Sequence, residues 1–183
     1  MIAYPGFMFA APPRTGSTWF IHACSLYGLG DGIKSKVHIP FPDGSSNFTV
    51  SLVRHPYSWL VSYYHALKGG AVNVVIVDKL CSIAATSETV EVFILRYLDQ
   101  MPGHVTMIFD EYKASTVMRL EDFPWAPLEF FASIALNKKG AQDVRALMPV
   151  NATKGEYHKP NKSLKCQVVD SEKELCERYN YYS

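Results

Sequence analysis

Hydrophobic positions along this chain follow two different periods in turn, and the alternation predicts strands separated by helices. The apolar run "GFMFAAP" at 6–12 is bounded by glycine and proline, which predicts a short buried strand. From Ser17 the apolar residues recur at helical spacing until "GLGDG", so a helix should follow this strand. A β-branched run at 47–54 predicts another strand, and the next helix should begin at Pro56 and stop at Gly69.

The second half of the chain continues the same alternation. Apolar residues between Val90 and Met101 recur at helical intervals, which predicts an amphipathic helix ending at Pro102-Gly103. The segment 71–86 is compatible with a strand or with a buried helix. The remaining predicted elements are a short strand at 34–40, a buried strand at 116–122, a helix near 126–136, a polar loop at 137–167 and a C-terminal helix whose capping box joins Ser171 to Glu174. Strands alternating with helices predict an α/β fold with a mainly parallel sheet.

The composition limits the classes of function. The chain has 183 residues, 48% of them hydrophobic, which is enough for a single domain spanning 1–183 with a real core. A net charge of +1 gives no general attraction to nucleic acid or to anionic membrane, so neither is an expected partner and any anion site must be local. The four cysteines lack CxxC or metal-ligand spacing, which predicts free thiols and no metal. Because the N-terminus has no basic leader, we expect a cytoplasmic protein.

One stretch has the composition of an anion-binding loop. "APPRTGSTWF" at 11–20 lies between a predicted strand and a predicted helix, where backbone N–H groups and the helix dipole attract anions. Gly16 allows close approach of the backbone, Arg14 adds a forked cation, and further donors are the hydroxyls of Thr15, Ser17 and Thr18. A Walker A loop needs a lysine after its last glycine, where this chain has Ser17. Phosphate or sulfate is the expected ligand, and an ordinary strand–helix turn is the structural alternative.

A second polar stretch follows the strand predicted at 47–54. In "VRHPYSWLVSYY", Arg54 ends that strand, and His55, Ser58 and Ser62 fall on one side of the following helix. This side is roughly opposite the helix's apolar stripe. A polar helix face beside an arginine suits a second phosphate, while a solvated helix surface is the simpler alternative.

Together the two stretches resemble the cofactor-binding signatures of the sulfotransferases that use 3′-phosphoadenosine 5′-phosphosulfate (PAPS). "PRTGSTW" at 13–19 matches the family's P-[KR]-[ST]-G-[ST]-[ST]-W loop at every position, and "RHPYSWLVSYY" has the arginine, proline and later serine of its second motif. The resemblance implies a three-layer, P-loop-like fold with a mainly parallel sheet between helices. It assigns the 5′-phosphosulfate to Arg14, Thr15, Gly16, Ser17 and Thr18, the adenine to Trp19, and the 3′-phosphate to Arg54 and Ser62. A place in the helix core is the alternative for Trp19.

The resemblance also implies a catalytic set. "KSKVHIP" is similar to the family's lysine-x-histidine-x-proline segment, which makes His38 the general base and Lys36 an auxiliary charge. Arg14 stands where many family members carry a lysine near the bridging oxygen, so it supplies positive charge there but no proton. His22 is a weaker candidate for the base. Residues 20–53 contain no glutamate, which argues against a glutamate base.

The sequence gives fewer signals for the part of the site that would bind the acceptor. "NATKGEYHK" is similar to the family's late basic loop, which implies that Lys154 and Gly155 contact the 3′-phosphate. The chain is short for the family, so we expect an open acceptor site shaped by 25–46 and 68–88, or one completed by a second subunit in a homodimer. The acceptor would be a hydroxyl or amine of a small molecule or carbohydrate.

Two other functions stay open from the sequence. A small-molecule kinase of the P-loop type is the first, although the Walker lysine and a clear acidic strand end for Mg²⁺ are missing. The second is a catalytically inactive nucleotide-binding protein of the same fold, which the trimmed acceptor region favours.

Overall fold

The computed structural model describes residues 1–30, 37–42, 44, 48–70, 78–133 and 161–182. The chain divides into two compact units. Unit 1 comprises Met1–Arg54 and Phe109–Ala152, and unit 2 comprises His55–Ile108 and Thr153–Ser183.

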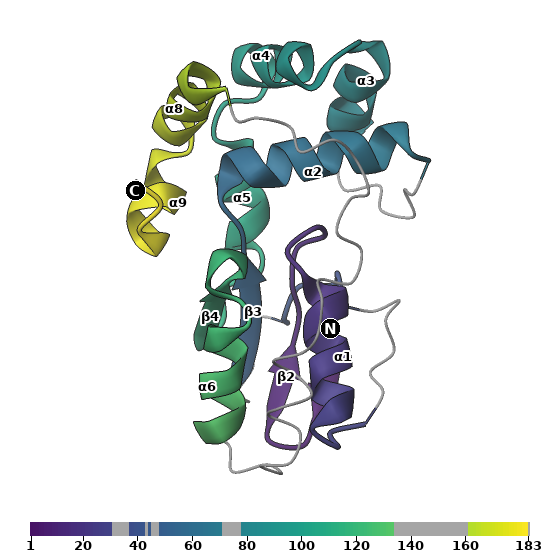
Figure 1. The fold of residues 1–183 in the computed structure, drawn as a ribbon, viewed down its shortest axis with the longest axis vertical. Coiled ribbons are helices and arrows are strands. Elements are labelled where there is room, and N and C mark those ends of the chain that lie inside the picture. The colour runs from purple at the N-terminus through teal and green to yellow at the C-terminus, as the bar shows by residue number, and fades with distance from the viewer. Residues whose placement is uncertain (31–36, 43, 45–47, 71–77, 134–160, 183) are drawn as a thin grey trace. The chain divides into compact units, whose positions relative to one another are not determined.

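The described part of unit 1 is built on a four-stranded sheet in the order β1-β2-β3-β4. The strands are β1 (Ile2–Tyr4), β2 (Phe7–Phe9), β3 (Thr49–Val53) and β4 (Thr116–Arg119). β1 runs antiparallel to β2 after a turn in which Gly6 has a φ of 89°, a backbone conformation that favours glycine. The other neighbouring strands are parallel, and they lie side by side in Figure 1. The predicted α/β class with a mainly parallel sheet is confirmed.

Two helices of unit 1 share one apolar core with the sheet. They are α1 (Ser17–Leu26) and α6 (Trp125–Ser133). The ring centroid of Phe20 on α1 lies 4.4 Å from that of Phe9 and 5.6 Å from that of Phe131 on α6. The strand residues in this core all point to the same face of the sheet: Ile2, Tyr4, Phe7, Phe9, Val50, Leu52 and Met118. Burial of such a side chain stabilises the unit by about 1.5–3 kcal/mol. This core therefore holds β2 and its neighbours in place, and with them the start of the loop that follows β2. The three-layer sulfotransferase arrangement stays a prediction.

Unit 2 is helical in its described residues. The predicted helix at Pro56 is α2 (Pro56–Lys68), which ends at Gly69 as expected, and the amphipathic helix is α4 (Val90–Gln100), capped by the Thr89 side chain. The other helices are α3 (Asp78–Thr86), α5 (His104–Asp110, whose last two residues are assigned to unit 1), α8 (Lys162–Ser171) and α9 (Lys173–Tyr179). None of the helices in the described ranges is long and apolar enough to cross a membrane.

A buried carboxylate links the helices of unit 2. Glu172, at the junction of α8 and α9, is fully buried. Its Oε2 accepts hydrogen bonds from the Thr106 backbone N–H at 2.8 Å and from the Thr106 hydroxyl at 2.6 Å, and its Oε1 accepts one from the Tyr97 hydroxyl. Burial and then the charge of Glu172 raise the pKa of Tyr97, so this phenol stays a donor. The carboxylate thereby joins α4, α5 and the α8–α9 junction.

The prediction of a C-terminal capping box between Ser171 and Glu174 is wrong. Ser171 is the last residue of α8, and its hydroxyl accepts a hydrogen bond from the Gly103 backbone N–H at 3.2 Å. The following helix starts at Lys173 and has no side-chain cap. The C-terminal helix therefore starts one residue later than the capping box predicts, and Glu172 just before it forms the buried hydrogen bonds.

Two further predictions differ from the structure, and one helix was not predicted. Residues 162–167, predicted as loop, belong to α8, whose N-cap is Asn161 and whose only buried side chains are Leu164 and Val168. The polar composition of this segment concealed the helix. The described residues 37–40 form a turn and not a strand. The short helix α5 was not predicted, and the segments 71–77 and 134–160 lie outside the described residues.

Candidate functional site

The loop after β2 has an unusual backbone. Arg14 has a φ of 66° and Gly16 a φ of 88°, both in the left-handed region. For a side-chain-bearing residue such as Arg14 this conformation costs about 1–2 kcal/mol, and such strain concentrates at functional sites. Gly16 is the N-cap of α1 and supplies no side-chain cap to the helix. The first N–H groups of a helix have no intrahelical partners, so this end of α1 suits an anion.

Gly16 is required by a close contact that the sequence did not indicate. A Cβ added at Gly16 would lie 2.5 Å from Cδ1 of Leu120, in the 3₁₀ turn Leu120–Asp122 that follows β4. The bare Gly16 backbone therefore admits Leu120 on that side. The turn is held by Arg119, which donates to both carboxylate oxygens of Asp122 at 2.6 and 2.7 Å. Leu120 supports the loop from the direction of β4.

The three loop hydroxyls have different environments. The Thr15 hydroxyl donates to the backbone oxygen of Pro12 at 2.6 Å, and the Thr15 side chain is fully buried. This differs from the prediction that Thr15 offers its hydroxyl to a ligand, because the bond closes the loop on itself. Ser17 is buried and Thr18 is half-buried. The residues with partial exposure are Arg14, Gly16 and Thr18.

Arg54 brings the second motif to the first. It follows β3, the parallel neighbour of β2, and its Nη1 donates to the backbone oxygen of Arg14 at 3.1 Å. Parallel strands bring their carboxyl ends to the same edge of a sheet. The Arg14 side chain is half-buried, and burial lowers the pKa of this guanidinium, which is basic enough to remain charged. Two arginines 40 residues apart in sequence thus meet at the loop.

His38 lies at the same strand end. Its Nδ1 is 2.8 Å from the backbone oxygen of Ala11, and the Ala11 N–H donates to the backbone oxygen of Val37 at 3.1 Å. Because a carbonyl oxygen only accepts, Nδ1 carries the proton and the lone pair of the neutral ring is on Nε2. Burial lowers the pKa of His38, against the opposing effect of the Ala11 bond, so the ring favours the neutral form. A neutral histidine of defined tautomer is suited to accept a proton.

Trp19 belongs to the core of unit 1. It is 5% exposed, and its ring centroid lies 4.8 Å from that of Phe123. This packing matches the structural alternative for Trp19. Its contact with an adenine stays a prediction.

For the other predicted site residues, the described structure gives no contact with the loop after β2. Ser62 lies on α2 in unit 2 and is 4% exposed, so it does not lie on a solvated helix surface, the simpler alternative for this stretch. His55, on the same predicted face, is the N-cap of α2, and its ring accepts from the Tyr57 N–H at 3.1 Å. The pairing of Arg54 with Ser62 stays a prediction. Lys36, Lys154 and Gly155 lie outside the described residues.

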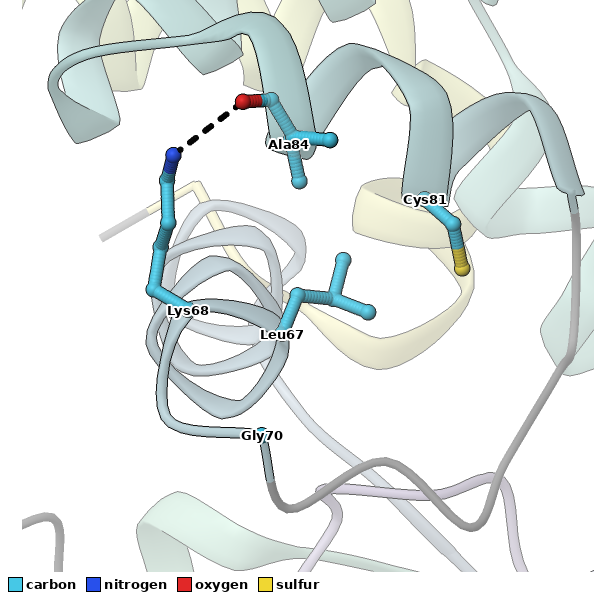
Figure 2. Close-up of a pocket in the computed structure, with 6 residues that line it drawn as sticks. Leu67, Lys68, Gly70, Cys81 and Ala84 are labelled. Carbon is cyan, nitrogen blue, oxygen red and sulfur yellow. Dashed lines mark hydrogen bonds between the residues drawn. The ribbon is translucent and has the colours of Figure 1, made fainter.

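A pocket in unit 2 offers little chemistry by comparison. It encloses about 380 Å³ between α2 and α3 and is lined by Leu67, Lys68, Gly70, Cys81, Ala84 and Ala85 (Figure 2). Lys68 Nζ donates to the backbone oxygen of Ala85 at 3.3 Å. All of these lining residues except Leu67 lie in the segment 68–88, which was expected to help shape the acceptor site. None of the residues predicted to bind the cofactor or to act in catalysis lines this pocket.

Comparisons with known proteins do not add to this picture. No protein-family model, curated protein or solved structure matches the chain. Within the described ranges, no group of three or more histidine, cysteine, aspartate or glutamate side chains is arranged to hold a metal ion. The residues at the ends of β2 and β3 therefore carry the functional information in the described structure.

Proposed function

We propose that this chain is a sulfotransferase that moves the sulfuryl group of PAPS to a hydroxyl or amine acceptor. The observation that carries the proposal is the hydrogen bond from Arg54 Nη1 to the Arg14 backbone oxygen. It joins the two sequence stretches that resemble the PAPS-binding motifs of the sulfotransferases. His38 is held at the end of the same strand, against Ala11.

The loop residues fit the anionic end of PAPS. The uncapped first turn of α1 offers backbone N–H donors, and Arg14 supplies a cation whose left-handed backbone is fixed by Arg54. Preorganised donors of this kind stabilise charge that develops on a leaving phosphate without further rearrangement. PAPS itself supplies an activated sulfuryl group. Arg54 would bind the 3′-phosphate.

His38 would hold the acceptor's proton. A general base needs a lone pair at neutral pH, and the bond from Nδ1 to Ala11 leaves that lone pair on Nε2. The lowered pKa of His38 keeps most rings neutral under these conditions. Nε2 is therefore the atom to which the acceptor hydroxyl or amine would pass its proton.

A transfer assay with a matched histidine control tests the proposal. Transfer of labelled sulfate from PAPS is measured over a panel of sugars, phenols, alcohols and amines, and binding of 3′-phosphoadenosine 5′-phosphate (PAP) is measured by calorimetry. We expect His38→Ala to lose transfer while it keeps PAP binding, and His22→Ala, which alters an exposed residue of α1, to keep both. Thermal protection by ATP without protection by PAP would instead favour a kinase. PAP binding with no transfer to any acceptor would favour an inactive nucleotide-binding protein.

A further inference from the structure

Tyr112 contacts the segment that carries the proposed base. Its hydroxyl donates to the backbone oxygen of His38 at 2.7 Å, although the two residues are 74 positions apart. The Tyr112 side chain is buried, and both residues belong to unit 1. Tyr112 lies just after α5 and before β4, so no sequence motif connects it with His38.

The turn at residues 37–38 is held by a small set of bonds. Because these residues are in neither a helix nor a strand, no regular backbone ladder fixes them. The Ala11 N–H donates to Val37, and the His38 ring donates back to Ala11. The Tyr112 hydroxyl donates a hydrogen bond to the His38 backbone oxygen. The ring and the backbone of His38 are thus held by two segments that are far apart in the sequence.

The Tyr112 hydroxyl can keep this role over a wide pH range. Burial, and then the charge of Glu111, raise the pKa of Tyr112 to about 12. The phenol therefore remains a donor throughout the range in which a histidine changes its protonation state. A change of His38 charge would leave the hydrogen bond to its backbone in place.

We propose that Tyr112 is a positioning residue, which holds the His38 backbone so that the ring keeps its Nδ1–H bond to Ala11 and presents Nε2 as a base. The catalytic part of this inference rests on the proposed sulfotransferase function. The claim that Tyr112 fixes the tautomer of His38 does not depend on that function. Small errors in the placement of a reacting group cost about 100-fold in rate, so a single buried hydroxyl can matter for turnover.

The test compares Tyr112→Phe with Tyr57→Phe. Each variant removes one buried tyrosine hydroxyl bonded to the backbone, since the Tyr57 hydroxyl accepts from the Asn161 N–H at 3.2 Å in unit 2. Nitrogen NMR of His38 reports the tautomer without any need for activity. We expect the Nδ1–H form in the wild type and in Tyr57→Phe, and a mixture of tautomers in Tyr112→Phe. An unchanged tautomer in Tyr112→Phe would overturn the inference.

Kinetics supply the second readout. We expect Tyr112→Phe to lower kcat about 10–100-fold with KM for PAPS within about twofold, while Tyr57→Phe keeps both values. An unchanged kcat would also overturn the positioning role. If the wild type transfers no sulfate, the proposed function fails, while the NMR comparison still decides the role of Tyr112.

A substitution that retains the hydroxyl covers the case in which Tyr112→Phe does not fold. 3-Fluorotyrosine at position 112 keeps the ring and makes the phenol a stronger donor. The carbonyl carbon resonance of His38 should then shift relative to the wild type. No shift would mean that the Tyr112 hydroxyl does not bond to His38, which would overturn the inference.

Discussion

Replacing Gly16 by alanine tests how the anion loop is supported. The added Cβ would meet Cδ1 of Leu120 at 2.5 Å, and the backbone would have to keep a φ of 88°. The left-handed conformation costs a residue with a Cβ about 1–2 kcal/mol. Leu120 is the end of a flexible side chain, and forcing it from its rotamer adds about 0.5–1.5 kcal/mol. We therefore expect Gly16→Ala to lower the free energy of unfolding by about 2–3 kcal/mol.

Gly28→Ala is the matched control. Gly28 also has a positive φ, 77°, but a Cβ there would meet nothing within 4 Å. Its replacement should cost only the backbone part, about 1–2 kcal/mol. The difference between the two variants isolates the contact with Leu120. It should be about 1 kcal/mol, which corresponds to roughly 2–4 °C in Tm for a chain of this size.

Urea unfolding of both variants, monitored by circular dichroism, measures this difference. A double variant with Leu120→Ala should remove the excess cost of Gly16→Ala, because the clashing atom is then absent. PAP affinity should fall in Gly16→Ala and stay near the wild-type value in Gly28→Ala. Equal destabilisation by the two glycine substitutions would refute the placement of Leu120 over Gly16.

Three further predictions concern single residues. Thr15→Val should lower the free energy of unfolding by about 1 kcal/mol with little effect on PAP binding, whereas Thr18→Val should do the reverse; the same effect for both would contradict the different roles of their hydroxyls. Glu172→Gln should lower the free energy of unfolding by about 3 kcal/mol, because an amide NH₂ cannot accept from the buried donors, and the exposed Glu174→Gln should change it little; equal denaturation curves would contradict the network. Because burial lowers the pKa of His38, its NMR titration should have a midpoint below the ordinary value of about 6.5, and stability should rise with pH between the two values since the unfolded chain binds more protons there; a midpoint above that value would contradict this.

The helices with strong end signals were predictable from the sequence. α2 begins at Pro56 and stops before Gly69, and both residues have local backbone preferences that do not depend on the rest of the chain. α5 and most of α8 were not predicted, although Asn161 caps the first turn of α8. α8 buries only two side chains, and α5 has only seven residues, so neither produces a clear apolar period.

The break between α8 and α9 shows how a local sequence signal can give a wrong prediction. Ser171 and Glu174 have the spacing of a capping box, which predicts a helix start from local chemistry alone. The structure places the break one residue later because Glu172 bonds to Tyr97 and Thr106, which are far away in the sequence. A local pattern cannot indicate partners of this kind.

Some features of the candidate site were predictable from the sequence, and others were not. The anion loop and the strand-terminal Arg54 could be found from residue types and spacing. The contact between Arg54 and Arg14, the support of Gly16 by Leu120 and the bond from Tyr112 to His38 come from the pairing of β2, β3 and β4. The internal bond of Thr15 also needed the folded loop, because all three hydroxyls look alike in the sequence.

Dissociation constants for PAP and for adenosine 5′-phosphate, which lacks the 3′-phosphate, test the central claim most directly. The wild type should prefer PAP by about 10–100-fold, the contribution of a charge-assisted hydrogen bond. Arg54→Ala should lose this preference, whereas Arg119→Ala, which removes a strand-end arginine paired with Asp122, should keep it. A wild-type chain that binds the two nucleotides equally, or a preference that survives in Arg54→Ala, would contradict the assignment of Arg54 to the 3′-phosphate.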